Sequence, residues 1–355
     1  LYAGLRSALR NFSHRIADSF LIYTIFGIGI NLLILFPILA FIKQYTGTQN
    51  RVVFVLAFSL NSFVLVNYYL TWFKMAGGAF FLCGLYILLH AEKIREWYAA
   101  GMLFGIGANM HAGSALGIPL FFVWAVFNRF QQASGSRIKF LIAPSALVLI
   151  FVLLNLPWAA VKHHYLRDSN ALVREHFLGG VSEPGGLMKA TKTFFSKVPI
   201  SEQVVHRTER LFDSFRIKEV KILISTLKTE SFTKFKRLWN QYEFRFAAFS
   251  FYPLFGLLAV IAIYGLFNKI VLKNDIAVIG FTSPKEVAQL LVLSTLTIAT
   301  IILLSYGSHK PDLNYHLPMG VTLLAYSLVL GCILRSKRIA LMIPLIYYAS
   351  VSYTH

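Results

Sequence analysis

Long apolar stretches, separated by short polar segments, fill most of this sequence. A helix needs about 17–25 mostly apolar residues to cross the hydrocarbon layer of a bilayer. By that measure about ten candidate spans lie at residues 20–42, 52–70, 75–90, 98–110, 112–127, 140–157, 247–267, 288–305, 317–334 and 340–354. The pattern therefore predicts an all-α fold, a multipass transmembrane helical bundle.

Two of these stretches, on either side of residue 111, are individually short. A single straight helix over residues 98–127 would overshoot the hydrocarbon layer and would run through several glycines. These are Gly101, Gly105, Gly107, Gly113 and Gly117. We therefore expect a tight hairpin or a broken helix pair, with the backbone groups freed at the break satisfied inside the protein.

Two other segments have a different pattern. Over residues 1–19, apolar side chains recur at helical spacing opposite Arg6, Arg10 and Arg15, which is typical of an amphipathic helix lying on a membrane. Residues 158–246 form the one sizeable extramembrane region, and their second part has the periodicity of amphipathic helices. The chain is thus divided into an interfacial helix, an N-terminal transmembrane bundle, an exterior loop region with amphipathic helices and a set of C-terminal transmembrane helices, over residues 1–19, 20–157, 158–246 and 247–355.

Composition supports a membrane protein and excludes a soluble globular domain. Hydrophobic residues make up 57% of the chain and charged residues 14%, and the mean hydropathy is +0.63. The formal net charge of +19 would suggest a nucleic-acid partner in a soluble protein, but in a membrane protein its location decides its meaning. We expect no nucleic acid among the partners.

The basic residues of the short connections are divided unequally between the two sides of the membrane. When the connections are numbered alternately, the short loops of one set hold only Lys74 and Lys310. The other set holds Lys43, Arg51, Lys93, Arg95, Arg129, Arg137, Lys139, Lys269, Lys273, Lys285, Arg335, Lys337 and Arg338. The positive-inside rule places this larger set in the cytoplasm. We expect an integral protein of the bacterial cytoplasmic (inner) membrane, with its active face and residues 158–246 outside.

Asp, Glu, Lys and Arg are absent from the interiors of the predicted spans and gather at their exterior ends. Ion-coupled transporters usually have ionisable groups at mid-membrane and helices interrupted symmetrically in two halves, and this sequence has neither sign. The exterior cluster indicates a site at the membrane–water boundary for a substrate with a lipid tail and an anionic head. His163 and His164 are adjacent, a pair that rarely chelates one ion, and no Cys or third His lies nearby, so we expect no metal.

Four segments of the chain resemble a known family. They look like the third span, the next helix pair, the start of the large exterior loop and the late Lys…Tyr-x-Leu-Pro motif of lipid-carrier-dependent glycosyltransferases of the C superfamily. That group includes the protein O-mannosyltransferases and the aminoarabinose transferases. The segments are, in the same order, residues 72–86, 101–124, 157–181 and 310–318.

The resemblance implies transfer of a sugar from a polyprenyl-phosphate carrier to a protein, lipid or glycan acceptor at the exterior face, without a cofactor. Such a displacement needs a carboxylate that deprotonates or orients the acceptor and cations that hold the departing phosphate. The family's carboxylates lie before the interfacial helix with which this sequence begins. We therefore expect the catalytic acid upstream of Leu1, in a longer protein; the possible substitutes are Asp18, Asp168, Glu183 and Asp312.

Eight residues are predicted to bind the substrate: Lys74, His111, Arg174, Glu175, His176, His309, Lys310 and Tyr315. Each also has a simpler explanation. A lysine at a helix end can act as a membrane anchor, a polar residue at a hairpin can cap freed backbone groups, and a charged loop can be a solvated surface. For the whole chain, a membrane transporter or lipid flippase and a non-catalytic assembly subunit are the alternatives to an enzyme.

Overall fold

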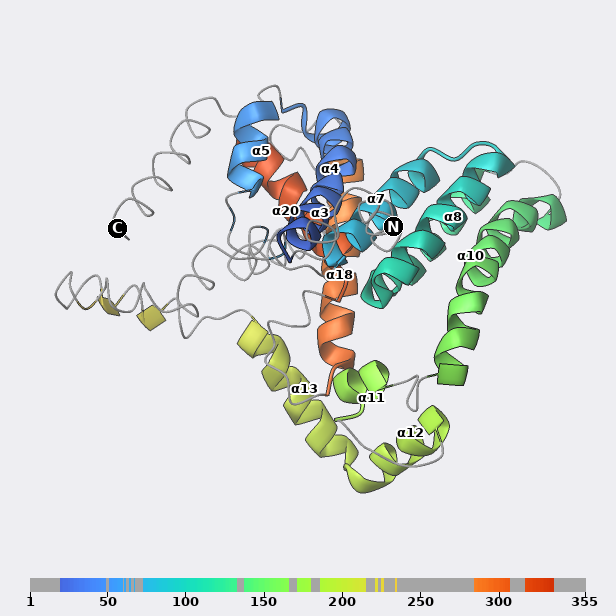
Figure 1. The fold of residues 1–355 in the computed structure, drawn as a ribbon, viewed down its shortest axis with the longest axis vertical. Helices are drawn as coiled ribbons and strands as arrows, with labels where there is room; N and C mark the ends of the chain where they lie inside the picture. The colour runs from blue at the N-terminus through green and yellow to red at the C-terminus, as the bar shows by residue number, and fades with distance from the viewer. Residues whose placement is uncertain are drawn as a thin grey trace, which may run out of the picture.

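The computed structural model shows a helical protein (Figure 1). It describes residues 20–48, 51–59, 61, 64, 67, 73–132, 137–165, 171–179, 186–214, 221–222, 225–226, 234, 284–306 and 317–334. No β-strand occurs among these residues, which confirms the all-α prediction. The predicted interfacial helix over residues 1–19 and the predicted spans over 247–267 and 340–354 lie outside the described residues.

Apolar helices make up most of the described part. The elements are α3 (Phe20–Asn31), η1 (Leu32–Ile34), α4 (Leu35–Phe41), η2 (Ile42–Thr46), α5 (Arg51–Ser59), α7 (Lys74–Leu89), α8 (Ile94–Met110), η3 (Ala112–Gly117), α9 (Ile118–Gln132), α10 (Arg137–Tyr165), α11 (Ala171–Phe177), α12 (Gly186–Lys197), α13 (Ile200–Ser214), α18 (Pro284–Leu304) and α20 (Met319–Leu334). Four helical stretches are long and apolar enough to cross a membrane: Thr24–Thr46, Ala112–Phe130, Leu141–Tyr165 and Glu286–Leu304. They indicate a membrane protein, and the total of ten spans stays a prediction.

The first described span runs without interruption from α3 through η2 and ends at a glycine. Gly47 has a φ of 62°, in the left-handed region that glycine adopts without steric cost. Just beyond it, the Thr48 hydroxyl donates a 2.7 Å hydrogen bond to the carbonyl oxygen of Gly331 in α20. The Thr46 hydroxyl lies 2.8 Å from that of Thr48. A buried hydroxyl pair therefore joins segments that are 283 positions apart in the sequence.

The chain reverses direction at His111, as the two short apolar stretches predicted. His111 follows α8 with an extended backbone (φ −150°, ψ 107°), and the 3-10 helix η3 begins at the next residue. Near the end of α9, Nη1 of Arg129 donates to the carbonyl oxygens of Ala91 and Glu92, at 3.4 Å each. Those two residues precede α8. Residues 98–127 therefore form a hairpin of helices rather than one straight helix.

Small residues allow α7 to pack closely against its neighbours. A Cβ added at Gly84 would lie 2.9 Å from the ring of Phe104 in α8, and one added at Gly78 would lie 3.1 Å from the backbone nitrogen of Gly320 in α20. Phe81 is buried between these contacts, with its ring centroid 5.6 Å from that of Phe104. Close approach through small residues is typical of helices packed in a membrane, where apolar burial alone does not drive association.

The connections between helices gather at two ends of the bundle. What we call the basic end consists of residues 42–46, 90–93 and 128–132 and the first turn of α18, and each of these four segments contributes residues to the lining of one cavity. What we call the distal end consists of the first turn of α7 with residues 111–114, 305–306 and 317–318. Alternating connections predicted this separation into two sets.

Three short helices of the predicted extramembrane region lie beyond the distal end (Figure 1). Pro157, the predicted end of a span, does not end α10, which continues to Tyr165. A proline in a helix removes only one backbone donor, and an apolar helix with its other groups paired can tolerate that loss. In α12, Phe194 is buried beside Leu178 and packs against Tyr306, which follows α18. The region is thereby attached to the distal end of α18.

Candidate functional site

Lys74 and His111, two of the predicted site residues, lie close together at the distal end. Lys74 begins α7, and His111 occupies the reversal between α8 and η3. The two segments approach each other at Gly77, where an added Cβ would lie 2.9 Å from His111 Cβ and 2.9 Å from the Ser114 hydroxyl oxygen. The fold thus places a cation and an imidazole at one point although they are far apart in the sequence.

The electrostatics of this point favour a neutral imidazole. Burial, and to a lesser extent the positive charge of Lys74, lower the pKa of His111 to about 4. At neutral pH the ring is therefore uncharged and can donate one hydrogen bond and accept another. Within the described residues, His111 Nδ1 and the hydroxyl of Ser114 are buried and have no hydrogen-bond partner. Such unsatisfied groups are costly in a fold and are available to a polar ligand that reaches them.

The predicted triplet Arg174, Glu175 and His176 lies on α11, also at the distal end. The backbone N–H of Tyr306 donates a 2.9 Å hydrogen bond to the carbonyl oxygen of His176. Glu175 is exposed, whereas Arg174 and His176 are half-buried. The distal end therefore receives predicted site residues from α7, from the α8–η3 reversal and from α11.

His309, Lys310 and Tyr315, the remaining predicted site residues, lie outside the described residues. The described residues on either side of that segment, Tyr306 and Leu317, both belong to the distal end. Tyr306 packs against α12, and the carbonyl of Leu317 lies against Gly113 of η3.

A cluster around Tyr306 was missed by the sequence analysis. The Tyr306 hydroxyl donates a 3.3 Å hydrogen bond to Glu202 of α13, and its ring lies 4.6 Å from that of His206. The guanidinium carbon of Arg207 lies 5.8 Å from the same ring, and Arg207 Nη1 donates to the carbonyl oxygen of Leu303 at 3.3 Å. Burial, followed by the charge of Glu202, raises the pKa of Tyr306. The i, i+4 spacing of Glu202 and His206 on α13 was the available signal.

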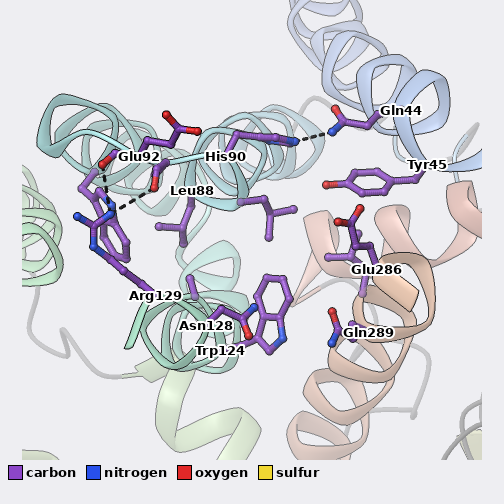
Figure 2. A pocket seen from close by; sticks show the side chains of 15 residues that line it. Gln44, Tyr45, Leu88, His90, Glu92, Trp124, Asn128, Arg129, Glu286 and Gln289 are labelled. Carbon is purple, nitrogen blue, oxygen red and sulfur yellow. Dashed lines mark hydrogen bonds between the residues drawn. The ribbon is translucent and has the colours of Figure 1, made fainter. Parts of the chain in front are cut away.

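The basic end holds a cavity of about 760 Å³, and none of the predicted site residues lines it (Figure 2). This volume lies within the range of about 300–1,000 Å³ that is usual for small-molecule sites. Polar and aromatic side chains from η2, the α7–α8 connection, α9 and α18 face it, among them Gln44, Tyr45, His90, Trp124, Arg129 and Glu286. Hydropathy patterning could not find this cavity, because its wall is assembled from four separate segments.

A hydrogen-bond network orders one wall of the cavity, and Figure 2 shows its contact between Gln44 and His90. Tyr86 OH donates to Gln44 Oε1 at 2.6 Å, and His90 Nδ1 lies 2.7 Å from the carbonyl oxygen of Tyr86. A carbonyl can only accept, so Nδ1 of His90 carries the proton. Nε2 of the neutral ring then accepts from the Gln44 amide nitrogen, 2.5 Å away. Each hydrogen bond of the network therefore has an assigned donor and acceptor.

Two opposite charges face the same cavity from different helices. Arg129, on α9, lies with its guanidinium carbon 5.5 Å from the ring centroid of Trp97. Glu286, in the first turn of α18, lies across the cavity beside Tyr45 (Figure 2). Among the described residues, neither Arg129 nor Glu286 forms an ion pair. The arrangement can therefore hold a ligand that carries both signs of charge.

The described residues include no group of three or more His, Cys, Asp or Glu side chains placed to hold a metal ion. Comparison of the chain with protein-family models, curated proteins and solved structures gives no match. The resemblance to lipid-carrier-dependent glycosyltransferases therefore depends on the sequence motifs alone, and the residues themselves must support any function.

Proposed function

We propose that this chain is part of a membrane glycosyltransferase that moves a sugar from a polyprenyl-phosphate carrier to an acceptor. The reaction would take place at the distal end, facing the exterior of a bacterial cytoplasmic membrane. The proposal is carried by one observation: His111 lies against the first turn of α7, which Lys74 begins, and the unsatisfied Ser114 hydroxyl lies beside them.

The chemistry of this point suits the departure of a phosphate. As the bond between the sugar and the carrier breaks, negative charge grows on the phosphate oxygens. Lys74 supplies a positive charge where α7 also presents its N-terminal backbone amides, and both stabilise an anion. His111 is neutral and can donate a hydrogen bond without adding charge. The acceptor would be activated by a carboxylate.

The triplet on α11 would contribute to donor binding. Arg174 can hold a phosphate with two parallel hydrogen bonds, and Glu175 can orient the guanidinium or bind sugar hydroxyls. Lys310 and Tyr315, in the segment between Tyr306 and Leu317, would act from the same end. The helices α12 and α13, attached through Tyr306, would cover the polar side of this site.

A transporter or flippase is the main competing function, and one experiment separates the two. Full-length protein in proteoliposomes is given a radiolabelled polyprenyl-phosphate sugar and a crude acceptor fraction. We expect labelled acceptor from the parent protein and roughly 10²-fold less from Lys74→Gln, the scale for loss of one charge-stabilising contact. Lys189→Gln, an exposed change on α12, is the matched control.

Equal transfer by the parent and Lys74→Gln proteins would refute the role of Lys74. Movement of the labelled lipid between leaflets without any labelled acceptor would instead identify a flippase.

A further inference from the structure

We infer that the cavity at the basic end binds the head group of a zwitterionic phospholipid, with the phosphate at Arg129 and the ammonium group at Glu286. This site is separate from the glycosyl-donor site proposed at the distal end. It involves none of that site's residues and does not depend on that function.

The position of the cavity on α9 favours a lipid over a water-soluble ligand. Trp124 and Asn128 line the cavity and lie one turn apart. The neighbouring positions Val123 and Phe127 are 62% and 56% exposed and lie within the candidate span Ala112–Phe130. An apolar stripe that faces lipid therefore runs beside the polar cavity. An acyl chain can lie along this stripe while its head group enters the cavity.

The charges on the two walls select the type of head group. The contacts of Arg129 with two carbonyl oxygens and with the Trp97 ring fix the guanidinium without neutralising it. Glu286 is exposed and, among the described residues, forms no hydrogen bond or ion pair. A ligand with a phosphate and an ammonium group places an opposite charge at each of these positions. In Figure 2 the ring of Trp124 lies between these two charges, and an aromatic ring there also favours the cation.

Ligands of a single charge fit less well. A purely anionic head group would meet Arg129 but would also face the carboxylate of Glu286, and Glu92 also borders the cavity. A purely cationic ligand would meet the two carboxylates but would leave the guanidinium without a counter-ion. The amides of Asn128 and Gln289 can donate to ester or phosphate oxygens of either kind of lipid, so they provide affinity rather than selection.

The test measures lipid binding to the detergent-purified full chain by native mass spectrometry. The probes are phosphatidylethanolamine, phosphatidylglycerol and the deacylated head group glycerophosphoethanolamine. We expect the parent protein to bind phosphatidylethanolamine about tenfold more tightly than phosphatidylglycerol, since one charge-assisted contact distinguishes them. Glycerophosphoethanolamine should bind much more weakly, because it has no acyl chain to contact Val123 and Phe127.

Two variants test the role of Glu286. Glu286→Gln should weaken phosphatidylethanolamine binding about tenfold, the value of one charge-assisted hydrogen bond, and Glu286→Lys should make phosphatidylglycerol the preferred lipid. Glu209→Gln, the same change at an exposed position of α13, should leave the binding of both lipids unchanged. Equal binding of the two lipids by the parent protein, or unchanged selectivity in Glu286→Gln, would overturn the inference. Binding of the deacylated head group as tight as that of the lipid would show a site for a free zwitterion instead.

Discussion

The basic end and the distal end of the bundle organise polar side chains in opposite ways. At the basic end, Gln44, Tyr86 and His90 satisfy one another around an open cavity. At the distal end the backbones are so close that Gly77 leaves no room for a Cβ, and polar atoms of His111 and Ser114 are buried without partners in the described part. The basic end has space for a ligand, whereas the distal end combines close backbone packing with buried polar atoms that have no partner among the described residues.

Two signs of a functional site, a large cavity and a group of perturbed polar side chains, are often expected in the same place. A large cavity marks a place where a molecule can reside, while perturbed and unsatisfied groups mark a place where charge can be stabilised. In this protein they occur at opposite ends of the same helices. The following predictions test that division, beginning with the largest expected effect.

The sidedness of the two ends gives an all-or-none prediction. A reporter inserted at Gly135, in the connection between α9 and α10, should read cytoplasmic, and one inserted at Ser201 of α13 should read exterior. The reason is the concentration of basic residues in the connections of one set. The measurement is a pair of fusions, one active only in the cytoplasm and one only outside it. If both reporters were found on the same side of the membrane, the distal end could not be assigned to the exterior face.

The tight packing of the distal end predicts a large loss of stability from a single methyl group. A Cβ at Gly113 would collide with the carbonyl oxygen of Leu317 and lie 2.7 Å from the His111 ring. Gly113→Ala should therefore destabilise the protein by about 3 kcal/mol, the upper part of the range for overpacking. The measurement is thermal unfolding of the purified protein, followed by fluorescence.

Gly29→Ala is the control for this substitution, because an added Cβ there meets no atom within 4 Å. It also replaces a glycine in a helix, which by itself is slightly stabilising. If both variants unfolded at the same temperature, Gly113 of η3 would not be tightly packed against the carbonyl group of Leu317.

The catalytic assignment of the distal end predicts a loss of activity with the fold intact. If Lys310 holds the departing phosphate as proposed, Lys310→Ala should lower sugar transfer roughly 10²-fold, because it removes one stabilising charge. Arg95→Ala, which removes a highly exposed cation in the first turn of α8, should leave transfer within about twofold of the parent value. Equal effects of the two changes would mean that overall charge, and not a distal site, controls activity.

The smallest expected effect is at the basic end, where Glu96 caps α8. The N–H groups of Lys93 and Glu92 donate to its carboxylate and lower the pKa of Glu96. A lowered folded-state pKa contributes stability above the unfolded value of about 4.3, and this contribution is lost as the pH falls. The melting temperature of the parent should therefore exceed that of Glu96→Gln at pH 7 and converge with it near about pH 3. A difference that grows on acidification would contradict the cap.

The sequence was sufficient to predict the features that depend on local composition. Hydropathy alone predicts long apolar helices, and the glycines around His111 predict that the chain reverses there. At the opposite end of this hairpin, Arg129 joins its two arms by donating to the carbonyl oxygens of Ala91 and Glu92. It also places Lys74 and His111 on the same side, because alternating connections must return to the same end of the bundle. The structure adds their proximity, which follows from the approach at Gly77.

Features that depend on several distant segments could not be predicted from local patterns. The cavity is formed by four such segments, and side chains such as Gln44, Asn128 and Gln289 look in the sequence like ordinary polar residues at helix ends. The continuation of α10 through Pro157 was missed for a different reason. A proline at the end of an apolar run favours a helix end, and the tolerance of a long helix for one lost donor is not visible in the composition.

The hydrogen bond from Thr48 to Gly331 has a consequence for biosynthesis. The polar end of the first described span acquires its partner only when α20 has been made, 283 residues later. At about 5–20 residues per second, this means that the Thr48 hydroxyl of a nascent chain waits roughly 15–60 s for its carbonyl partner in α20. A chain that stops before Met319 never acquires the partner.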